Sequence, residues 1–401
     1  MSGQKTTNTA LLITAKGEDA PGITAALTTA LANSGTKILD IEQVVIHNLL
    51  TLSILVEVKE GEKNPLLKDL LFQSKKLDID IDCHLVPEEE TVNNQHSSNT
   101  YVITCLGDDI PTKVISKVTT CLYEKGTNIE KISKLAWGKL NCLEIIAGSK
   151  LPIPLKELTG YFVPISHESG VDIAVQRENL FRKAKRLVVM DMDSTLIQVE
   201  VIDELAACAG IGGKVSAITE RAMNGEIDFS QSLRERVALL EGLDEKALDE
   251  VYRSLPLTSG AESLIKVLKS LGYKTAVISG GFDYFTDRLK EHLGLDYAFS
   301  NRLEIKDGKL TGRVIGDIVD GARKAEILEE IAKGEGFLLD QVIAIGDGAN
   351  DLPMLGKAGL GIAFNAKKTV REAANYSISQ KSLDSILYLL GINEKELNEL
   401  T

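Results

Sequence analysis

The sequence lacks the features that direct a protein to membranes or to nucleic acids. It contains no apolar run of the roughly eighteen residues that a membrane-spanning helix needs, so we expect no such helix. Basic residues are in deficit, with 45 Lys and Arg against 58 Asp and Glu and a net charge of −13. Because nucleic acids and anionic membranes attract basic surfaces, we expect neither as a partner. The first residues carry no basic stretch followed by an apolar one, so we also expect no secretory signal.

Cysteine is scarce, and its placement excludes several kinds of site. The five cysteines form no CxxC pair and the five histidines show no metal-ligand spacing, which argues against a disulfide framework and a zinc site. The Cys-x5-Arg pattern of thiolate phosphatases is missing, and so is a GxxxxGK[ST] phosphate loop. We therefore expect a cytoplasmic protein with reduced thiols, whose nucleophile, if it has one, is another kind of side chain.

The N-terminal part contains an internal duplication. Residues 12–21 and 102–111 share the same order of an apolar run, a glycine, an aspartate and a proline. The stretch 89–100 between the copies is polar and poor in apolar residues, which is typical of a linker. The duplication predicts two similar domains, over residues 1–88 and 101–180.

Each copy has the pattern of a ferredoxin-like α+β fold with the order β-α-β-β-α-β. In the first copy, residues 11–15 read as a strand, residues 23–31 have helical spacing, and residues 44–58 contain two apolar stretches. This pattern resembles the ACT domain, a small module that senses amino acids. The resemblance implies the ligand-binding residues Gly17, Asp19, Pro21, Gly22 and Ile23. The second copy has Thr112 and Lys113 in place of the last two, which weakens the expectation of ligand binding there.

Residues 181–401 have the pattern of a doubly wound, Rossmann-like α/β domain. Helical patterns alternate with runs that are apolar at nearly every position, which favours parallel strands buried on both faces. These runs are residues 187–190, 275–278, 341–345 and 360–364. Residues from about 200 to 257 interrupt the alternation with continuous helical patterns, so we predict a helical cap there.

Three of the predicted strands end in polar residues that suit phosphoryl chemistry. The first is followed by Asp191 and Asp193, the second by Ser279, and the third by Asp347. Because ligands bind beyond the carboxyl ends of parallel strands, we expect these residues to meet. Carboxylates suit Mg²⁺, the serine and the glycine amides after it suit phosphate oxygens, and Lys324 adds a positive charge. A divalent cation is required because carboxylates alone would repel a phosphate.

This set resembles the haloacid dehalogenase superfamily of phosphatases. The motifs are DMDST at 191–195, SGG at 279–281, Lys324 and GDGAND at 346–351. By that resemblance Asp191 is the nucleophile that forms an aspartyl-phosphate, and Asp193 is the proton donor and acceptor. The implied ligands of Mg²⁺ are Asp191, the backbone carbonyl of Asp193, and Asp347, supported by Asp351. The implied substrate-binding residues of these motifs are Ser279, Gly280, Lys324 and Asn350.

The resemblance narrows to the phosphoserine phosphatases of that superfamily and covers residues 186–390. By it, Arg236 binds the substrate carboxylate, Glu200 binds the ammonium group, and Met223 and Phe229 close over the aliphatic part. The implied reaction is Mg²⁺-dependent hydrolysis of O-phospho-L-serine, the last step of serine biosynthesis. The ACT pair implies feedback by an amino acid such as serine, and a homodimer formed through these domains.

Two other functions stay open on the sequence alone. One is a related phosphatase, or a phosphotransferase to another alcohol, that acts on another small phosphomonoester. Glu200 and Arg236 argue against sugar phosphates, because these carry neither an ammonium nor a carboxylate group. The other is a non-enzymatic amino-acid sensor built on an inactive phosphatase fold. The complete acid set of Asp191, Asp193 and Asp347 argues against it.

Overall fold

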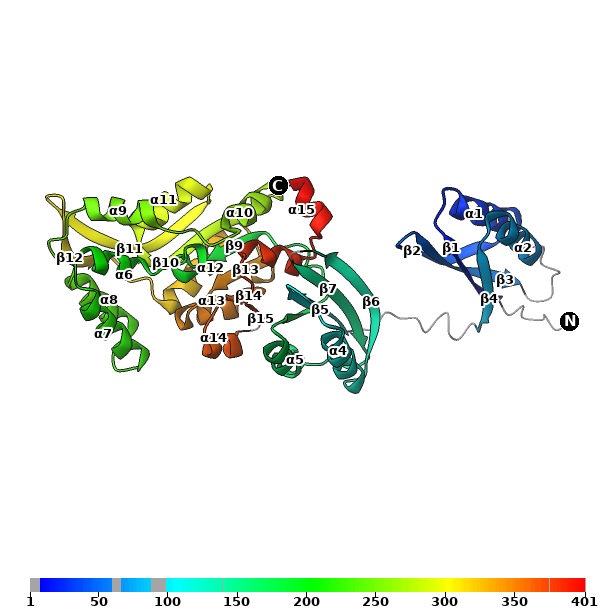
Figure 1. Cartoon of the computed structure of the whole chain (residues 1–401), viewed down its shortest axis with the longest axis horizontal. Coiled ribbons are helices and arrows are strands. Elements are labelled where there is room, and N and C mark those ends of the chain that lie inside the picture. Colours follow the sequence, from blue (N-terminus) through cyan, green and yellow to red (C-terminus); the bar gives the residue numbers. More distant parts are fainter. Residues whose placement is uncertain (1–7, 60–65, 88–98, 139, 375, 401) are drawn as a thin grey trace. The chain divides into compact units, whose positions relative to one another are not determined.

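The computed structural model describes residues 8–59, 66–87, 99–138, 140–374 and 376–400. The chain divides into two compact units, residues 1–96 and residues 97–401, and each is described by itself. Figure 1 labels the elements of both units along the chain. No helix in the described ranges is both long enough and apolar enough to cross a bilayer.

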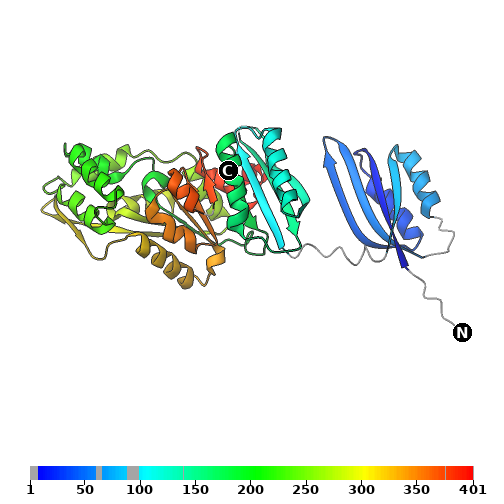
Figure 2. The same cartoon turned by 90° about the horizontal axis from the view of Figure 1, so that it is seen from below.

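The first unit has the predicted ferredoxin-like architecture. Its elements are β1 (Asn8–Glu18), α1 (Ile23–Asn33), β2 (Lys37–Ile46), β3 (Leu49–Lys59), α2 (Leu66–Leu77) and β4 (Asp80–Val86). The strands form an antiparallel sheet in the order β2-β3-β1-β4, and both helices cover one face of it (Figure 2). His47 and Asn48 join β2 to β3, and both have positive φ, as in the two-residue turns that fit the twist of a hairpin.

The second copy repeats this topology inside the larger unit. Its elements are β5 (Asn99–Gly107), α4 (Thr112–Glu124), β6 (Thr127–Ala136), β7 (Asn141–Ser149), α5 (Leu155–Ser169) and β8 (Asp172–Arg177). The sheet order is β6-β7-β5-β8. Most of the predicted linker, up to residue 98, lies outside the described residues, and Asn99 and Thr100 already belong to β5. Helix α1 is preceded by Gly22, whose backbone lies in the left-handed region, whereas α4 is preceded by Pro111. The two copies therefore differ at the start of this helix.

The rest of the unit is built on a seven-stranded sheet. Its strands are β9 (Leu187–Met190), β10 (Lys274–Phe282), β11 (Tyr297–Lys306), β12 (Lys309–Ile315), β13 (Val342–Gly346), β14 (Leu360–Phe364) and β15 (Tyr376–Ile378). The order is β12-β11-β10-β9-β13-β14-β15, and all neighbours are parallel except β11 and β12. Flanking helices are α10 (Ala261–Ser270), α11 (Asp283–Leu293), α12 (Gly321–Gly334), α13 (Leu352–Lys357), α14 (Lys368–Ala373) and α15 (Glu394–Leu400).

Strand β9 lies in the middle of this sheet and is buried on both faces. Val188 and Met190 belong to the hydrophobic cluster on one face, and Leu187 and Val189 belong to the cluster on the other. This alternation explains why a parallel strand reads as a continuous apolar run, and it confirms the predicted doubly wound fold. The chain passes from β9 to β10 and β11 on one side and returns to β13 on the other. The strand ends beside β9 therefore form the crevice in which such sheets bind ligands.

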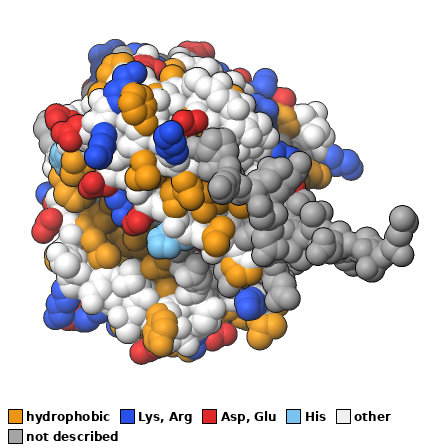
Figure 3. Space-filling view, turned by 90° about the vertical axis from the view of Figure 1, so that its right-hand side faces the viewer, with side chains coloured by type: hydrophobic (Ala, Val, Ile, Leu, Met, Phe, Trp, Pro, Cys, Tyr) orange, Lys and Arg blue, Asp and Glu red, His pale blue; other side chains and the backbone are white. Residues whose placement is uncertain are grey.

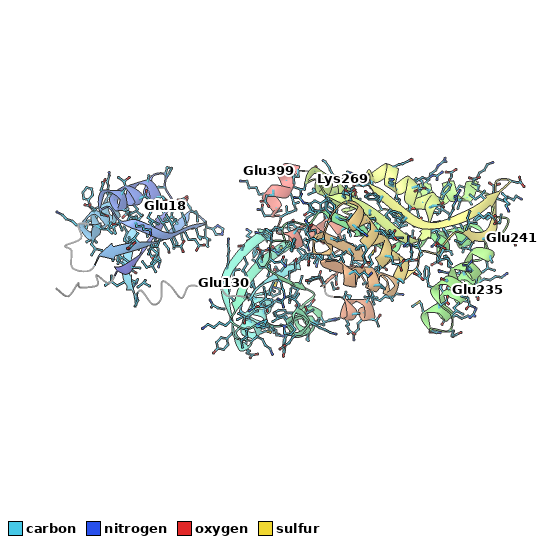
Figure 4. The ribbon with its side chains drawn as sticks, turned by 180° about the vertical axis from the view of Figure 1, so that it is seen from behind. Glu18, Glu130, Glu235, Glu241, Lys269 and Glu399 are labelled. Carbon is cyan, nitrogen blue, oxygen red and sulfur yellow. The ribbon has the colours of Figure 1, made fainter. Side chains whose placement is uncertain are left out.

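Four helices stand where the cap is predicted. They are α6 (Val201–Cys208), α7 (Gly212–Met223), α8 (Phe229–Ala238) and α9 (Lys246–Ser254). Leu233 and Val237 of α8 belong to the same hydrophobic cluster as β9, which fixes the inner side of the cap on the core. On the outer side, Glu235, labelled in Figure 4, pairs with Arg221 of α7 at 2.9 Å. The cap is thus packed against the core, and an ion pair joins its helices α7 and α8.

Polar contacts join the second ACT-like domain to the edge of this core. Gln176 donates from Nε2 to the carbonyl of Leu389 at 3.0 Å. Asp172, at the start of β8, accepts from the backbone N–H of Ser379 at 2.7 Å and from Gln380 Nε2 at 2.9 Å. Strand β8 therefore lies beside β15, and the domain and the core share one compact unit.

Candidate active site

The first candidate residue, Asp191, extends β9 by one residue. Its backbone N–H donates to the carbonyl of Ile345 on β13 at 2.9 Å, and its side chain is 5% exposed. Its Oδ1 atom accepts from the N–H of Met192 at 2.7 Å. The chain then leaves the sheet through Asp193, with φ −64° and ψ 134°, and Ser194, with a positive φ of 55°. This irregular turn brings the side chains of both aspartates to the end of the sheet.

Lys324 supplies the positive charge at this point. Its side chain is fully buried, and Nζ lies 2.7 Å from Asp191 Oδ2 and 2.7 Å from Asp351 Oδ1. Helix α12 can approach this closely because its first residue, Gly321, has no side chain: a Cβ there would lie 2.6 Å from the carbonyl oxygen of Asn350. Burial alone would lower the pKa of Lys324, but the two carboxylates outweigh it and raise the pKa.

Three carboxylates converge around the lysine. Oxygen atoms of Asp191, Asp347 and Asp351 all lie within 4.8 Å of one another. Asp347 accepts from Thr195 Oγ1 at 3.2 Å. Burial, followed by the charge of Asp351, raises the pKa of Asp191 well above its ordinary value, and burial, Asp351 and Glu200 raise the pKa of Asp347 to about 7. One lysine leaves this cluster with surplus negative charge, and hard oxygen ligands of this kind fit Mg²⁺.

Asp193 faces the second strand end. Ser279 Oγ donates to Asp193 Oδ2 at 3.3 Å and accepts from the N–H of Gly281 at 2.8 Å. The other carboxylate oxygen of Asp193 accepts from the N–H of Val201 at 2.9 Å, which ties it to the start of the cap. Burial, followed by the charge of Glu200, raises the pKa of Asp193 to about 7. A carboxyl group with such a pKa can both give and take a proton near neutral pH.

The glycines after Ser279 are packed too tightly for any side chain. A Cβ on Gly280 would lie 2.8 Å from Cζ of Phe229, and one on Gly281 would lie 2.8 Å from Asp193 Oδ2. The structure therefore places Phe229, at the first position of α8, directly against the phosphate-binding loop that the sequence predicts. Here the backbone amides approach the acidic cluster without interference from a side chain.

Asn301 holds this loop, a role that sequence patterns do not predict. Its side chain is fully buried in β11, donates from Nδ2 to the carbonyl of Gly280 at 2.8 Å and accepts from the N–H of Val319 at 2.8 Å. Asn301 lies in the middle of β11 and both of its partners are distant in the sequence, so no local pattern marks it as part of the site.

The predicted substrate-binding residues of the cap differ in their exposure to solvent. Glu200 precedes α6, is exposed, and accepts from Ser194 Oγ at 2.8 Å. Arg236 of α8 is partly buried. Burial lowers its pKa, while the charges of Asp203, Glu200 and Asp193 act in the opposite direction. Met223 lies at the end of α7 with 66% of its surface exposed.

Asn350 lies within the loop after β13. A Cβ on Gly348 would lie 2.1 Å from Asn350 Oδ1, so the amide side chain folds tightly over that glycine. The N–H of Gly348 donates to Asp351 Oδ2 at 3.0 Å, which fixes the carboxylate that also contacts Lys324. The GDGAND segment thus orients its own acids by local hydrogen bonds.

The predicted effector residues belong to the first unit and divide into two groups. Ile23 is 1% exposed within the hydrophobic cluster, and Gly17 packs so closely that a Cβ would lie 2.6 Å from Cγ2 of Ile79. Asp19, Pro21 and Gly22 are exposed in the loop before α1. The loop therefore offers an accessible surface that the buried residues hold in place.

Family models match three stretches of the chain. Residues 188–356 match the haloacid dehalogenase-like hydrolases, and residues 9–84 and 99–176 each match an ACT domain. The first match contains the site built above and runs from β9 nearly to the end of α13. The other two confirm the predicted ACT-like pair.

The chain is also similar to curated proteins over nearly its whole length. It is 44% identical over 401 residues to a phosphoserine phosphatase of Streptomyces coelicolor, covering 99% of this chain and 96% of the relative. It is 41% identical over 391 residues to a phosphoserine phosphatase of Mycobacterium tuberculosis, covering 96% and 94%.

Solved structures agree with this fold. A haloacid dehalogenase family hydrolase from Salmonella enterica serovar Typhi matches with a TM-score of 0.65 and 32% identity, covering 73% of this chain and 98% of that one. A probable phosphoserine phosphatase from Vibrio cholerae matches with a TM-score of 0.59 and 34% identity, covering 77% and 91%.

Replacement of the buried lysine is expected to destabilise the fold in a pH-dependent way. In Lys324→Met without metal, Asp191 and Asp351 lose the ammonium group that pairs with them. The free energy of unfolding should therefore fall by about 3–5 kcal/mol at pH 8. The folded pKa of Asp191 then lies above its unfolded value, so the loss is smaller at low pH, where this carboxyl group is protonated in both states, and grows as pH rises from the unfolded pKa toward the folded one.

Urea unfolding in EDTA at several pH values between 5 and 8 measures this effect. Lys333→Met, which changes an exposed lysine in the last turn of the same helix, is the control and should stay within about 0.5 kcal/mol of the parent protein. A Lys324→Met protein as stable as the parent at pH 8 would show that the lysine does not balance these acids.

Proposed function

The chain belongs to the phosphoserine phosphatase family of haloacid dehalogenase-like hydrolases, and on that premise we propose that it hydrolyses O-phospho-L-serine to serine and phosphate. One observation carries the proposal: Asp191, Asp193 and Lys324 meet at the strand ends, beside the Ser279 loop. Relatives at 44% and 41% identity are phosphoserine phosphatases, which supports the same assignment.

In the first half of the proposed reaction, a carboxylate oxygen of Asp191 attacks phosphorus and forms an aspartyl-phosphate. The bond from phosphorus to the seryl oxygen breaks, and Asp193 gives its proton to that oxygen, so serine leaves neutral at its hydroxyl. The ion pair with Lys324 holds the attacking carboxylate in one orientation. The hydroxyl of Ser279 and the amides after it bind phosphoryl oxygens, since the glycines leave the backbone uncovered.

In the second half, Asp193 takes a proton from a water molecule, whose oxygen attacks phosphorus and displaces Asp191. Phosphate leaves, and both aspartates return to their starting states. A pKa of about 7 for Asp193 suits this exchange of roles at neutral pH. Its hydrogen bonds to Ser279 and Val201 fix it beside the nucleophile, which limits the distance that the proton has to cover.

We propose that Mg²⁺ is held by Asp191, Asp347 and the backbone carbonyl of Asp193. Asp351 supports this set through its contacts with Lys324 and with the N–H of Gly348. When bound, the ion neutralises charge on the phosphoryl oxygens. The surplus negative charge of the carboxylate cluster is the structural reason to expect a cation here.

We further propose that the cap reads the amino-acid part of the substrate. Arg236 binds the carboxylate, because a guanidinium fork suits a planar anion, and Glu200 binds the ammonium group. Phe229, packed against Gly280, and Met223 cover the aliphatic part. Sugar phosphates lack both of these charges and O-phosphoethanolamine lacks the carboxylate, so the cap favours phosphoserine over them.

Amino-acid feedback through the first ACT domain is a further part of the proposal. The exposed loop with Asp19, Pro21 and Gly22 leads into a helix whose start is free of any side chain at Gly22. That arrangement leaves backbone N–H groups accessible to the carboxylate of an amino acid such as serine.

We also propose that the chain forms a homodimer through its ACT domains. Every described residue of the edge strand β2 is exposed, and apolar side chains are frequent on it, which is unusual for a strand that faces only water. Figure 3 shows exposed hydrophobic side chains interspersed with charged ones on one face. A molar mass of a single chain in sedimentation equilibrium at micromolar concentration would refute the dimer.

The nucleophile is tested by Asp191→Asn. Phosphate release from O-phospho-L-serine with Mg²⁺ should fall about 10³-fold or more, because an amide cannot attack phosphorus as a carboxylate does. EDTA should abolish release by the parent protein, and added Mg²⁺ should restore it. Asp307→Asn, in the exposed turn after β11 where asparagine also tolerates a positive φ, is the control. Comparable turnover in Asp191→Asn and Asp307→Asn contradicts the mechanism.

Substrate recognition is tested by Arg236→Ala. The KM for O-phospho-L-serine should rise about 10–100-fold, because a charged hydrogen bond to the carboxylate is lost. With O-phosphoethanolamine, which has no carboxylate, the same substitution should change kcat/KM little. Arg234→Ala, an exposed arginine on the same helix, should behave like the parent protein with both substrates. An equal effect on both substrates would place Arg236 in a structural role.

The effector loop is tested by Asp19→Ala in the full chain. The serine concentration that halves activity should rise about tenfold, since the loop loses an acceptor for the ammonium group. Asp109→Ala, at the matching position of the second copy, should leave this concentration unchanged. An unaltered response in Asp19→Ala would mean that serine acts elsewhere, for example as a product at the active site.

A further inference from the structure

The hairpin of β11 and β12 contacts both the Ser279 loop (residues 279–281) and the cap. In the middle of β11, Asn301 donates from Nδ2 to the carbonyl of Gly280 at 2.8 Å, which ties this strand to the loop. At the start of β12, Lys309 forms an isolated antiparallel bridge with Asp244, which lies between α8 and α9. The hairpin therefore connects the predicted phosphate-binding loop directly to the helices of the cap.

Backbone hydrogen bonds hold the turn of the hairpin against the cap. The N–H of Gly242 donates to the carbonyl of Leu310 at 2.8 Å, and the N–H of Leu310 donates to the carbonyl of Leu243 at 2.9 Å. The N–H of Glu245 donates to the carbonyl of Gly308 at 2.8 Å. Because these bonds join backbone to backbone, the position of the segment between α8 and α9 follows the position of the hairpin.

Gly312 allows β12 to approach the end of α8 closely. The register of β11 and β12 shifts between Leu303 and Ile305, and Gly312 lies in the resulting bulge with a positive φ of 77°. A Cβ at this glycine would lie 3.1 Å from Cβ of Glu241, labelled in Figure 4, and 3.2 Å from the carbonyl oxygen of Ala238, the last residue of α8. Any side chain at Gly312 would therefore displace the end of the helix relative to the hairpin.

The end of α8 carries Arg236, the residue that we assign to the substrate carboxylate. Its Nε atom donates to the carbonyl of Ser232 at 3.3 Å, so the guanidinium group extends toward the start of the helix. At that start, Phe229 packs against Gly280 of the Ser279 loop. The distance between the guanidinium group and the loop therefore depends on how the end of α8 is held.

We propose that the β11–β12 hairpin sets the distance between the Ser279 loop and Arg236, and that Gly312 is the positioning residue through which it does so. One element is fixed to the loop at Asn301 and to the end of α8 at Gly312. A substrate that carries a phosphoryl group and a carboxylate binds well only at one such distance, because a misplacement of ~1 Å can cost about 10²-fold. The hairpin thus selects the length of the phosphorylated amino acid, an inference that rests on the proposed function.

The test compares Gly312→Asn with Gly316→Asn. Both glycines have a positive φ, which asparagine tolerates, but a Cβ at Gly316 would meet nothing within 4 Å. In Gly312→Asn, the KM for O-phospho-L-serine should rise about five- to tenfold while kcat changes less than about twofold, because displacement of α8 weakens binding of the carboxylate. For O-phosphoethanolamine, which has no carboxylate, kcat/KM should stay within about twofold of the parent value. Gly316→Asn should match the parent protein with both substrates.

Gly312→Ala decides the matter if Gly312→Asn does not fold. Its Cβ requires a shift of only a few tenths of an ångström, so a rise in KM of about two- to threefold, again limited to O-phospho-L-serine, is expected. An unchanged KM, or an equal loss with both substrates, would overturn the positioning role. Arg236→Ala, assayed in parallel, separates the two proposals. If Arg236→Ala raises the KM and the folded Gly312 variants do not, the proposed recognition stands without the hairpin, whereas an unchanged KM in Arg236→Ala would overturn both.

Discussion

Lys324 is a fully buried cation between Asp191 and Asp351, and the arrangement of the active site depends on its charge. A buried carboxylate without a partner takes up a proton and ceases to be a nucleophile. The lysine opposes this, but the pKa of Asp191 is still raised, because burial and the charge of Asp351 outweigh the lysine. The cluster of Asp191, Asp347 and Asp351 contains more negative charge than one lysine can balance. The same imbalance that disfavours an ionised cluster in isolation attracts a divalent cation. Burial and the charge of Glu200 raise the pKa of Asp193 to about 7, which suits proton transfer.

The uncharged residues of the site also help to form it, because they let the backbone come close to the acidic side chains. Gly280 and Gly281 let a strand end approach the cap and the acids, and Asn301 holds that strand end from behind by two hydrogen bonds. Gly321 lets α12 approach the loop after β13, which is the reason that Lys324 reaches the acids at all. The close packing of small residues thus explains how three distant strand ends form one site.

Much of this architecture follows from local pattern. The alternate residues of β9 enter opposite hydrophobic clusters, so the apolar run at 187–190 correctly predicted a central parallel strand. In such sheets, ligands bind at the carboxyl ends of the strands beside the topological switch point. Asp191, Asp193 and Ser279 lie at these strand ends. The duplication was predicted equally well, because an apolar run, a glycine, an aspartate and a proline recur in the same order in both copies.

Other features depend on contacts that no local pattern records. The pairing of Lys324 with Asp351 requires α12 to pack against the loop after β13, and the role of Asn301 requires β11 to lie behind the Ser279 loop. The docking of Asp172 against the residues after β15 joins segments from two domains of different fold. Packing of side chains across the unit determines these contacts, so they become visible only in three dimensions.

The claim on which the account depends is that Asp191 carries the phosphoryl group during turnover. Rapid acid quenching of the Mg²⁺-loaded protein during turnover of O-phospho-L-serine, followed by mass spectrometry of its peptides, measures this directly. The account predicts the added mass of one phosphoryl group on the peptide that contains Asp191, and its absence from the same peptide of Asp191→Asn. Turnover without any phosphorylated peptide, or with the group on another residue, would contradict it.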